Sequence, residues 1–272
     1  MLEYKGISWY RYHGTLLPRV EPHESVSLSE TEQSELLKLS KAYFIRWCDE
    51  WDRGDGTFWY VIKDQKEDLS AYKSKVRNQI KKGLRNCDVK RVENSSVAKE
   101  GYRVYANAFK KYDTFITPLA QEAFAQSVLE SDDEFWAVFD HENRMIAYAN
   151  NIIKKDVCYY SSMKFDPDFL RLYPSYALIH TMNEHYLNDR GFRYVSDGSR
   201  SISHQTNIQD FLMTKFLFRK AFCKLHIAYR YDVNIAVHLL FPFRRFFYHQ
   251  DSSFSQKIAT LLKHEEIRRS YE

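Results

Sequence analysis

Three consecutive segments near the middle of the chain combine strand-like composition with very short connections, and this feature restricts the fold most. Residues 134–140 (EFWAVFD), 144–153 (RMIAYANNII) and 157–165 (VCYYSSMKF) are rich in aromatic and β-branched residues. The connections HEN and KKD are short and polar, which is typical of antiparallel hairpins. We therefore expect an antiparallel meander of three strands.

Elements of both types surround this meander. Residues 88–92 (DVKRV) alternate as a strand does, and apolar residues between 97 and 112 recur on one helical stripe. The segment 117–131 opens with a Thr-Pro pair, which favours a helix start. Residues 173–221 indicate a helix, a short strand, a polar hinge, a helix and a strand. The predicted order is strand, two helices, three strands, helix, strand, helix and strand.

Before residue 88 the sequence contains fewer patterns that indicate a helix or a strand. Ser29 is followed three positions later by Glu32, ahead of several leucines, and this spacing predicts a capped helix start. Residues 58–64 (FWYVIKD) are aromatic and β-branched enough to form a strand.

A basic amphipathic helix is predicted for residues 68–86. Its apolar residues recur at helical spacing, and lysines and arginines occupy the opposite side. The basic residues are Lys73, Lys75, Arg77, Lys81, Lys82 and Arg85. Two interpretations stay open: a solvated surface, which is the ordinary role of such a face, or a docking face for the phosphates of a cofactor or of RNA.

Composition excludes several classes of protein. With 272 residues and 44% hydrophobic content, the chain can bury a substantial core and is not expected to be disordered. Its formal charge of +4 argues against a dedicated nucleic-acid binder, and we expect no DNA partner. Glycines number only 8, and the chain has neither a P-loop nor a GxGxxG sequence. A nucleotide-hydrolysing or dinucleotide-dependent enzyme is therefore not expected.

The four cysteines lie far apart and form no CxxC or Cys/His cluster. We therefore expect neither a metal site nor a disulfide framework, and a reducing compartment. The first residues lack the basic head and apolar run of a signal peptide, and no apolar stretch is long enough to span a bilayer. These observations predict a soluble cytoplasmic protein.

The order of elements over residues 58–230 resembles the GNAT acyltransferase fold, and in detail its Fem-like branch of peptidoglycan-bridge peptidyltransferases. Residues 76–92 (VRNQIKKGLRNCDVKRV) are similar to the basic helix and strand that precede the second module of Fem-type proteins. Residues 207–222 (NIQDFLMTKFLFRKAF) are similar to its last helix and closing strand. The resemblance implies an α/β (α+β) fold with a central, mixed, mostly antiparallel sheet flanked by helices.

The resemblance also implies a division into domains. Fem-type enzymes resemble two fused modules, whereas the segment before residue 87 suffices only for a truncated first module. We expect an N-terminal extension at 1–86, a GNAT-like domain at 87–230 and a C-terminal helical tail at 231–272.

The turn that holds the donor pyrophosphate in CoA-dependent members departs from the family pattern. That pattern is Q/RxxGxG/A, with backbone N–H groups pointing at the anion, and the corresponding stretch here is RLYPSYA. Pro174 brings no N–H donor, and Tyr176 adds bulk where the backbone should approach closely. The resemblance still places the donor at Arg171, Ser175 and Tyr176, because a helix start offers free N–H groups to an anion.

Acyl transfer to an amine needs a base, donors for the oxyanion and stabilisation of the leaving group. Asp197 and His204, in the polar hinge, are the available acid–base pair, and Tyr160 in the meander is a third catalytic candidate. Plainer roles stay open, since Asp197 ends a strand and a lone histidine is more often a hydrogen-bonded surface or core residue. The remaining candidates for donor binding are Ser199, Arg200 and Asn207.

These features predict an N-acyltransferase that moves an acyl or aminoacyl group from an activated donor to a small-molecule or peptide amine. The resemblance implies acyl-CoA as co-substrate with no tightly bound cofactor, or aminoacyl-tRNA in a Fem-like peptidyltransferase. A non-catalytic protein that keeps the fold and binds an anion or RNA is the alternative. Residues 237–248 (VHLLFPFRRFFY) are aromatic and basic enough to contact a membrane surface, although packing as a terminal helix is the plainer role.

Overall fold

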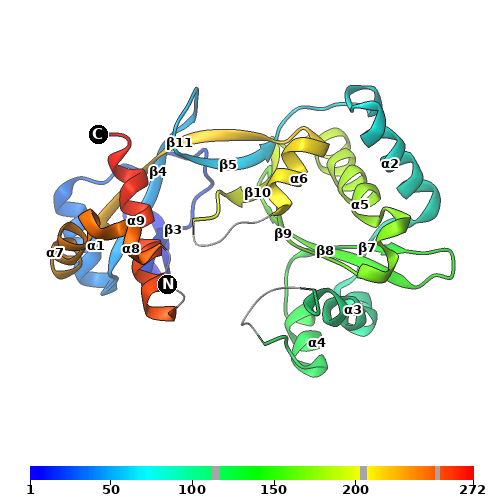
Figure 1. Cartoon of the computed structure of the whole chain (residues 1–272), viewed down its shortest axis with the longest axis horizontal. Helices are drawn as coiled ribbons and strands as arrows, with labels where there is room; N and C mark the ends of the chain where they lie inside the picture. The colour runs from blue at the N-terminus through cyan, green and yellow to red at the C-terminus, as the bar shows by residue number, and fades with distance from the viewer. Residues whose placement is uncertain (112–116, 203–206, 249–251) are drawn as a thin grey trace. The chain divides into compact units, whose positions relative to one another are not determined.

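The chain forms two compact units of discontinuous sequence. The computed structural model describes residues 1–111, 117–202, 207–248 and 252–272, and Figure 1 colours them along the chain. Unit 1 consists of Met1–Tyr60, Ser199–Asn207 and Lys220–Glu272. Unit 2 consists of Val61–Gly198 and Ile208–Arg219.

Unit 1 contains strands from both ends of the chain. They are β1 (Leu2–Tyr4), β2 (Ile7–Tyr12), β3 (Thr15–Pro18), β4 (Phe44–Arg53) and most of β11 (Arg219–Tyr229). The pairs β1–β2, β2–β3 and β4–β11 are antiparallel, and β3–β4 is parallel. Strand β5 (Phe58–Lys63) begins in unit 1 and ends in unit 2.

The helices of unit 1 flank these strands. They are α1 (Glu30–Ser40), α7 (Tyr231–Leu240), the short η4 (Phe241–Phe243), α8 (Arg244–Phe247) and α9 (Ser253–Arg269). The predicted capping signal is confirmed, because the N–H of Glu32 donates to the Ser29 hydroxyl and the N–H of Ser29 donates to the Glu32 carboxylate. Helix α1 thereby buries Leu36 against a core that includes Trp9 and Ile45.

Unit 2 contains the predicted meander. Its strands are β6 (Asp88–Val92), β7 (Glu134–Phe139), β8 (Met145–Lys154), β9 (Val157–Phe165) and β10 (Tyr194–Ser199), the last residue of which falls in unit 1. Strands β6 to β9 pair antiparallel in sequence order, and β9 pairs parallel with β10. The mixed, mostly antiparallel sheet expected from the sequence is confirmed.

Helices cover both faces of this sheet. They are α2 (Ser74–Asn86), α3 (Asn94–Phe109), α4 (Gln121–Leu129), α5 (Pro174–Asn183) and α6 (Asn207–Phe216), with the short η1 (Leu69–Ala71), η2 (Pro167–Leu172) and η3 (Glu184–Asp189). Figure 1 shows α3 and α4 on one face and α2 and α5 on the other. Val97 and Phe124, from α3 and α4, pack with Tyr148 of β8 in the core of the first face.

A buried carboxylate joins α3 to the end of the meander. Asp166, which follows β9, accepts hydrogen bonds from Arg103 and Asn107 of α3. It also accepts the N–H of Asp168 at the start of η2. This network fixes the segment that leads from β9 into α5.

The continuous helix predicted for residues 68–86 is partly wrong. A short 3-10 turn, η1, is capped by Asp68 and separated from α2 by Tyr72 and Lys73, whose backbones are extended. The reason is local, because the Asp68 carboxylate accepts the N–H of Ser70 and so starts a separate turn. The prediction that the apolar residues of this segment face the core is confirmed for Tyr72, Val76 and Ile80, which are buried.

Candidate active site

Strands β9 and β10 pair over only three residues each. The pairs are Val157 with Tyr194, Cys158 with Val195 and Tyr159 with Ser196. The structure describes every residue of both strands. It shows no further pair between them, although β9 continues to Phe165. The two strands therefore part toward their carboxyl ends.

A β-bulge lies in β9 immediately past this parting. Asn150 of β8 opposes Ser162, and the next residue, Asn151, opposes Tyr160, so that Ser161 is an extra residue. A bulge bends its strand and redirects backbone groups out of the ladder. Backbone N–H groups around Ser161 are thus turned out of the ladder at the level where β10 leaves β9.

Asp197 is the first residue of β10 beyond the last pair. Burial raises the pKa of its carboxyl from 3.8 to about 7, although a hydrogen bond with Gln209 of α6 acts in the opposite direction. A carboxyl group with such a pKa can exchange a proton near neutral pH, as a general base must. The next residue, Gly198, has a φ of +85°, and its N–H donates to the Ser196 hydroxyl, so the backbone turns away directly after Asp197.

Tyr160 occupies the strand position before the bulged residue. Its side chain is buried, and its hydroxyl donates to Oδ1 of Asn183 in α5 over 2.7 Å. Burial raises the pKa of Tyr160 well above its usual value. The structure thus holds this hydroxyl in a bond between β9 and α5.

The start of α5 differs from an open anion cradle. Tyr173 has a left-handed backbone, and its carbonyl oxygen accepts the N–H groups of Tyr176 and Ala177 at 3.1 and 3.2 Å. Pro174 has no N–H, so Ser175 is the first residue of the helix that can donate one. Arg171, in η2, is exposed and has no ion-pair partner among the described residues.

The side chain of Tyr176 is buried among aromatic rings. Its ring lies 5.9, 5.3 and 5.7 Å from those of Tyr173, Phe211 and Phe216, and the last two rings belong to α6. The rings join α5 to α6 on this face of the sheet.

A basic pocket adjoins the same helix start. It has a volume of about 540 Å³ and is lined by Ser74, Lys75, Asn78, Gln79, Lys82 and Tyr173. Gly83 allows α2 to approach α5 here, because a Cβ atom at this position would lie 2.6 Å from the carbonyl oxygen of Tyr173. The sequence predicts the basic face of α2, but the proximity of this face to Tyr173 depends on the packing of two helices.

The remaining predicted site residues lie in or near the hinge. The backbone N–H of Arg200 donates to the carbonyl oxygen of Trp59 over 2.9 Å, and its guanidinium stacks 4.3 Å from that indole ring. Burial lowers the pKa of Arg200. Ser199 and Asn207 group with Arg200 in unit 1, whereas Asp197, Tyr160, Arg171, Ser175 and Tyr176 group in unit 2. His204 lies outside the described residues.

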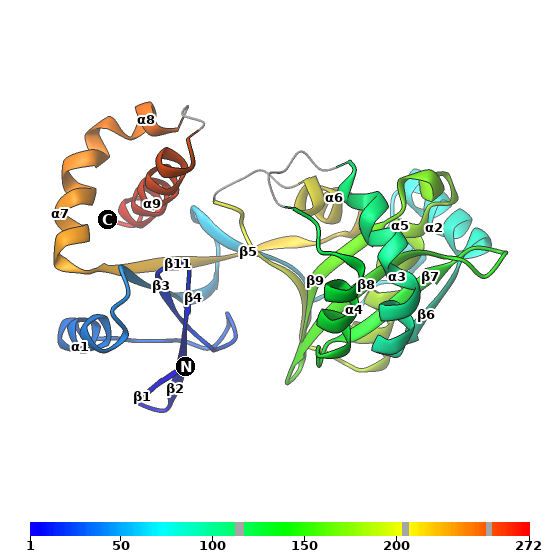
Figure 2. The ribbon, with the colours of Figure 1, turned by 90° about the horizontal axis from the view of Figure 1, so that it is seen from below.

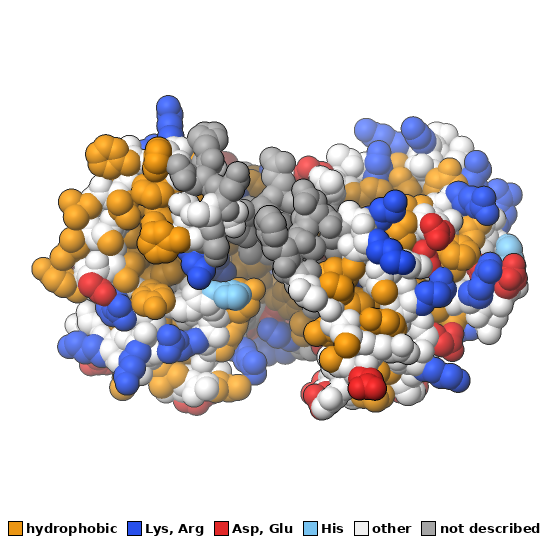
Figure 3. Space-filling view, turned by 60° about the horizontal axis from the view of Figure 1, so that its bottom comes forward, with side chains coloured by type: hydrophobic (Ala, Val, Ile, Leu, Met, Phe, Trp, Pro, Cys, Tyr) orange, Lys and Arg blue, Asp and Glu red, His pale blue; other side chains and the backbone are white. Residues whose placement is uncertain are grey.

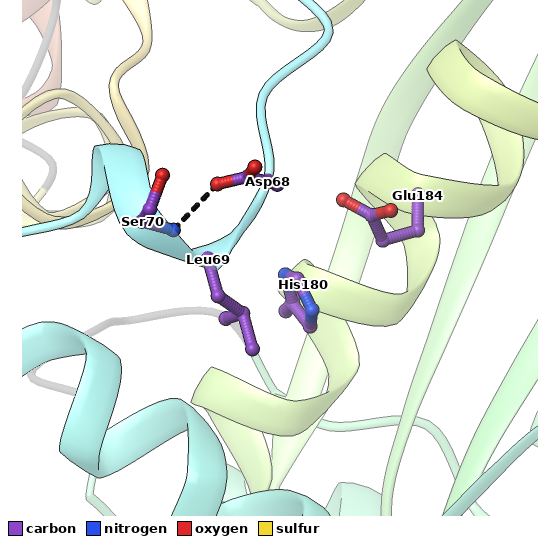
Figure 4. Close-up of a pocket in the computed structure, with 5 residues that line it drawn as sticks. All are labelled: Asp68, Leu69, Ser70, His180 and Glu184. Atoms are coloured by element: carbon purple, nitrogen blue, oxygen red, sulfur yellow. Dashed lines mark hydrogen bonds between the residues drawn. The ribbon is translucent and has the colours of Figure 1, made fainter.

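A second pocket of unit 2 involves a histidine that sequence reasoning missed. It has a volume of about 410 Å³ and is lined by Asp68, Leu69, Ser70, His180 and Glu184, as Figure 4 shows. Burial lowers the pKa of His180, and its Nδ1 has no hydrogen-bond partner among the described residues. His180 follows Tyr173 by seven residues, which places it about 10 Å further along α5. The only sequence signal is the i, i+4 spacing of His180 and Glu184 on one helical face.

Within the described ranges, no group of three or more His, Cys, Asp or Glu side chains is arranged to hold a metal ion. Among the groups of unit 2 described above, the carboxyl group of Asp197 can exchange a proton, and the cations of α2 can bind an anion.

Comparisons with known proteins agree with the fold of unit 2. Residues 70–199 match the family model described as the acetyltransferase (GNAT) domain. No curated protein matches the chain by sequence.

Solved structures with a similar fold cover most of the chain. FemX is 11% identical with a TM-score of 0.54, covering 82% of this chain and 82% of its own. The C-terminal domain (DUF2156) of a putative lysylphosphatidylglycerol synthetase from Agrobacterium fabrum is 12% identical with a TM-score of 0.52, covering 85% and 83%. L-PGS from Bacillus licheniformis is 13% identical with a TM-score of 0.51, covering 97% and 86%. Residues 70–199 thus match a GNAT acetyltransferase domain, and the fold of the chain is similar to those of FemX and of the lysylphosphatidylglycerol synthetase domain.

Proposed function

We propose that this chain is an N-acyltransferase that uses Asp197 as the general base and takes its acyl group from an acyl-CoA. The family match supports N-acyl transfer at the general level. The observation that carries the proposal is the coincidence of three features: the parting of β9 and β10, the bulge at Ser161 and the carboxyl of Asp197.

Asp197 supplies what an amine acceptor needs. A protonated amine cannot attack a carbonyl carbon, so it must first lose a proton. The raised pKa of Asp197, about 7, lets its carboxylate take that proton near neutral pH and release it afterwards.

The bulged strand supplies the second requirement. Attack of the amine nitrogen on the thioester carbonyl forms a C–N bond and places negative charge on the oxygen, which N–H groups of β9 near Ser161 can stabilise. As this intermediate collapses, the nitrogen loses its second proton, the C–S bond breaks, and CoA leaves as a thiolate that takes up a proton. The products are the amide and the free thiol.

The basic pocket beside Tyr173 supplies a place for the phosphates of the donor. Lys75 and Lys82 line it, and no acidic residue is present in α2 to neutralise them. Exposed lysines are point charges that suit phosphate groups of variable geometry. Arg171, predicted as a donor contact, remains a candidate for the same role.

The proposal is tested by measuring thiol release. The purified chain is incubated with acetyl-CoA or a longer acyl-CoA and a panel of amines, and free CoA is titrated with a chromogenic disulfide. We expect amine-dependent CoA release that falls at least about 100-fold in Asp197→Asn, since general-base catalysis contributes at least that factor. The matched control, Asp156→Asn, removes an exposed carboxylate of unit 2 and leaves the rate unchanged.

The donor site is tested by charge reversal. The double variant Lys75→Glu, Lys82→Glu should raise the KM for acyl-CoA at least about tenfold and leave kcat nearly unchanged, because it removes ground-state binding of phosphate. The double variant Lys99→Glu, Lys111→Glu changes the net charge equally at exposed positions of unit 2 and should leave the KM unchanged. Equal KM values for the two double variants would refute this placement.

A second candidate donor, aminoacyl-tRNA, is favoured by one specific observation. The cations of α2 extend beyond the pocket, because Lys73, Lys81 and Arg85 are exposed and have no ion-pair partner among the described residues. RNA binding predicts an affinity that falls steeply with salt concentration. Transfer from aminoacyl-tRNA to an amine without any turnover of acyl-CoA would replace the acyl-CoA proposal by this one.

A further inference from the structure

The C-terminal helices of unit 1 present a set of large apolar side chains to solvent. They are Tyr231, Ile235 and Leu239 of α7, Phe243 of η4, Phe246 of α8 and Phe254 of α9, and together they are called the tail patch. The exposed fractions of Leu239, Phe243, Phe246 and Phe254 are 68%, 66%, 65% and 74%. Scattered exposed apolar residues are ordinary, but six within 24 consecutive positions mark an interaction surface.

Three members of the tail patch share one face of α7. Tyr231, Ile235 and Leu239 are spaced by four residues, so they form one stripe along α7. The only buried residue of α7 is Val237, which lies off this stripe. Figure 2 shows α7 and α8 forming an arc with α9 on its inner side, and Figure 3 shows hydrophobic side chains gathered over the α7–α8 region.

The charges around the tail patch are mostly of one sign. Residues 230–263 contain five Lys or Arg residues and two acidic residues, Asp232 and Asp251. Asp232 is paired with Arg230, and Arg244 is paired with Glu266, which lies just beyond this range. Arg245 and Lys257 are exposed and have no ion-pair partner among the described residues. The surface near the patch is therefore complementary to an anionic partner.

We propose that the tail patch docks this protein on the surface of an anionic lipid bilayer. Phe, Leu and Tyr side chains on an exposed helical stripe can enter the interfacial region of a bilayer, and neighbouring Arg and Lys side chains bind its phosphates. The apolar side chains of the tail patch are exposed to solvent, which suits a flat lipid surface better than a peptide that needs a groove.

Docking on a bilayer surface differs from spanning it. Among the helices that the structure describes, none combines the length and apolar composition needed to cross a bilayer. The contact is thus peripheral, and its strength depends on both the apolar side chains and the anionic lipid fraction. The proposal does not depend on the acyl donor, because its test measures binding alone.

The test is sedimentation with vesicles of phosphatidylcholine, with or without phosphatidylglycerol. We expect the whole chain to sediment with the anionic vesicles and to be released by salt. The double variant Phe243→Glu, Phe246→Glu should bind at least about tenfold more weakly, since two phenylalanines leave the interface. The matched control Leu39→Glu, Leu129→Glu adds the same charge at exposed leucines outside the patch and should bind about twofold more weakly at most, through its added charge alone.

A second variant separates charge from apolar contact. Arg245→Glu, Lys257→Glu should lose the preference for phosphatidylglycerol and keep the circular dichroism spectrum of the wild type, because both side chains are exposed. Failure of the wild type to bind anionic vesicles would overturn the proposal, and so would equal binding of the phenylalanine variant and its leucine control. A dimer in solution that Phe243→Glu, Phe246→Glu converts to a monomer would instead identify the tail patch as a contact between two copies.

Discussion

Replacing Asp197 by asparagine should make the protein more stable at neutral pH while removing its proposed base. The folded protein raises the pKa of this carboxyl from 3.8 to about 7, mainly because the group is buried. The ionised form is therefore less favourable in the folded state than in the unfolded state. Asparagine has nearly the same shape and carries no charge at any pH, so it escapes this cost.

The magnitude follows from the two pKa values. Each tenfold change in proton affinity corresponds to about 1.4 kcal/mol, so the ionised carboxylate costs the folded state about 4 kcal/mol above pH 7. Below the unfolded pKa both states are protonated and the cost vanishes. Between the two values the folded state binds more protons, so the free energy of unfolding falls as pH rises.

The assay is urea unfolding followed by circular dichroism, for the wild type and for Asp197→Asn at several pH values. We expect the stability difference to grow in favour of the variant by about 2.5 kcal/mol between about pH 5 and about pH 8. Histidines titrate equally in both proteins and cancel in the difference. A difference that does not change with pH would refute the reasoning, as would an equal slope in the control variant Asp156→Asn.

Three further substitutions test contacts that stabilise the fold. Gly83→Ala should destabilise the protein by about 1 to 3 kcal/mol in thermal unfolding, because the new methyl group meets the carbonyl oxygen of Tyr173, although alanine is the better helix former; a gain in stability would show that the helices are not in close contact. Asp166→Ala should cost about 1 to 3 kcal/mol, since it removes the buried acceptor of hydrogen bonds from Arg103 and Asn107, and an unchanged urea midpoint would contradict this. Ser29→Ala should cost about 1 kcal/mol through loss of the helix cap, and the same variant with glycine should recover part of that loss.

The sequence predicted those strands and helices whose pattern can be recognised within a few consecutive residues. Alternation and short polar connections located β7, β8 and β9 to within one residue at each end. The break at Tyr72 was missed because its side chain keeps the apolar spacing of a helix while its backbone is extended. Periodicity reports which side chains face the core, and it does not report whether the backbone between them is continuous.

The candidate site was less accessible to sequence reasoning because its features depend on pairing across the sheet. The bulge at Ser161 leaves no trace in the run YYSSM, since one extra residue shows only against the register of β8. Asp197 was named from its place at a strand end, but its raised pKa comes from burial beside α6. The i, i+4 spacing of His180 and Glu184 is too common on helices to distinguish His180 from a core residue.

The proposed donor site relies on side chains more than on backbone N–H groups, and this follows from the start of α5. A cradle of N–H groups needs small residues and free donors, whereas Pro174 has no N–H and Tyr176 is packed against α6. The positive charge that remains beside Tyr173 comes from Lys75 and Lys82 of α2, which Gly83 brings into contact with α5.

Flexible lysines fix an anion less rigidly than backbone donors do, and counterions in solution compete with them. A donor held in this way should bind more weakly as salt concentration rises, whether its phosphates belong to CoA or to RNA. The slope of log affinity against log salt concentration reports the number of phosphates that the protein contacts. A slope that corresponds to two or three phosphate contacts fits a CoA donor. A much steeper slope requires the whole basic face of α2 and hence RNA.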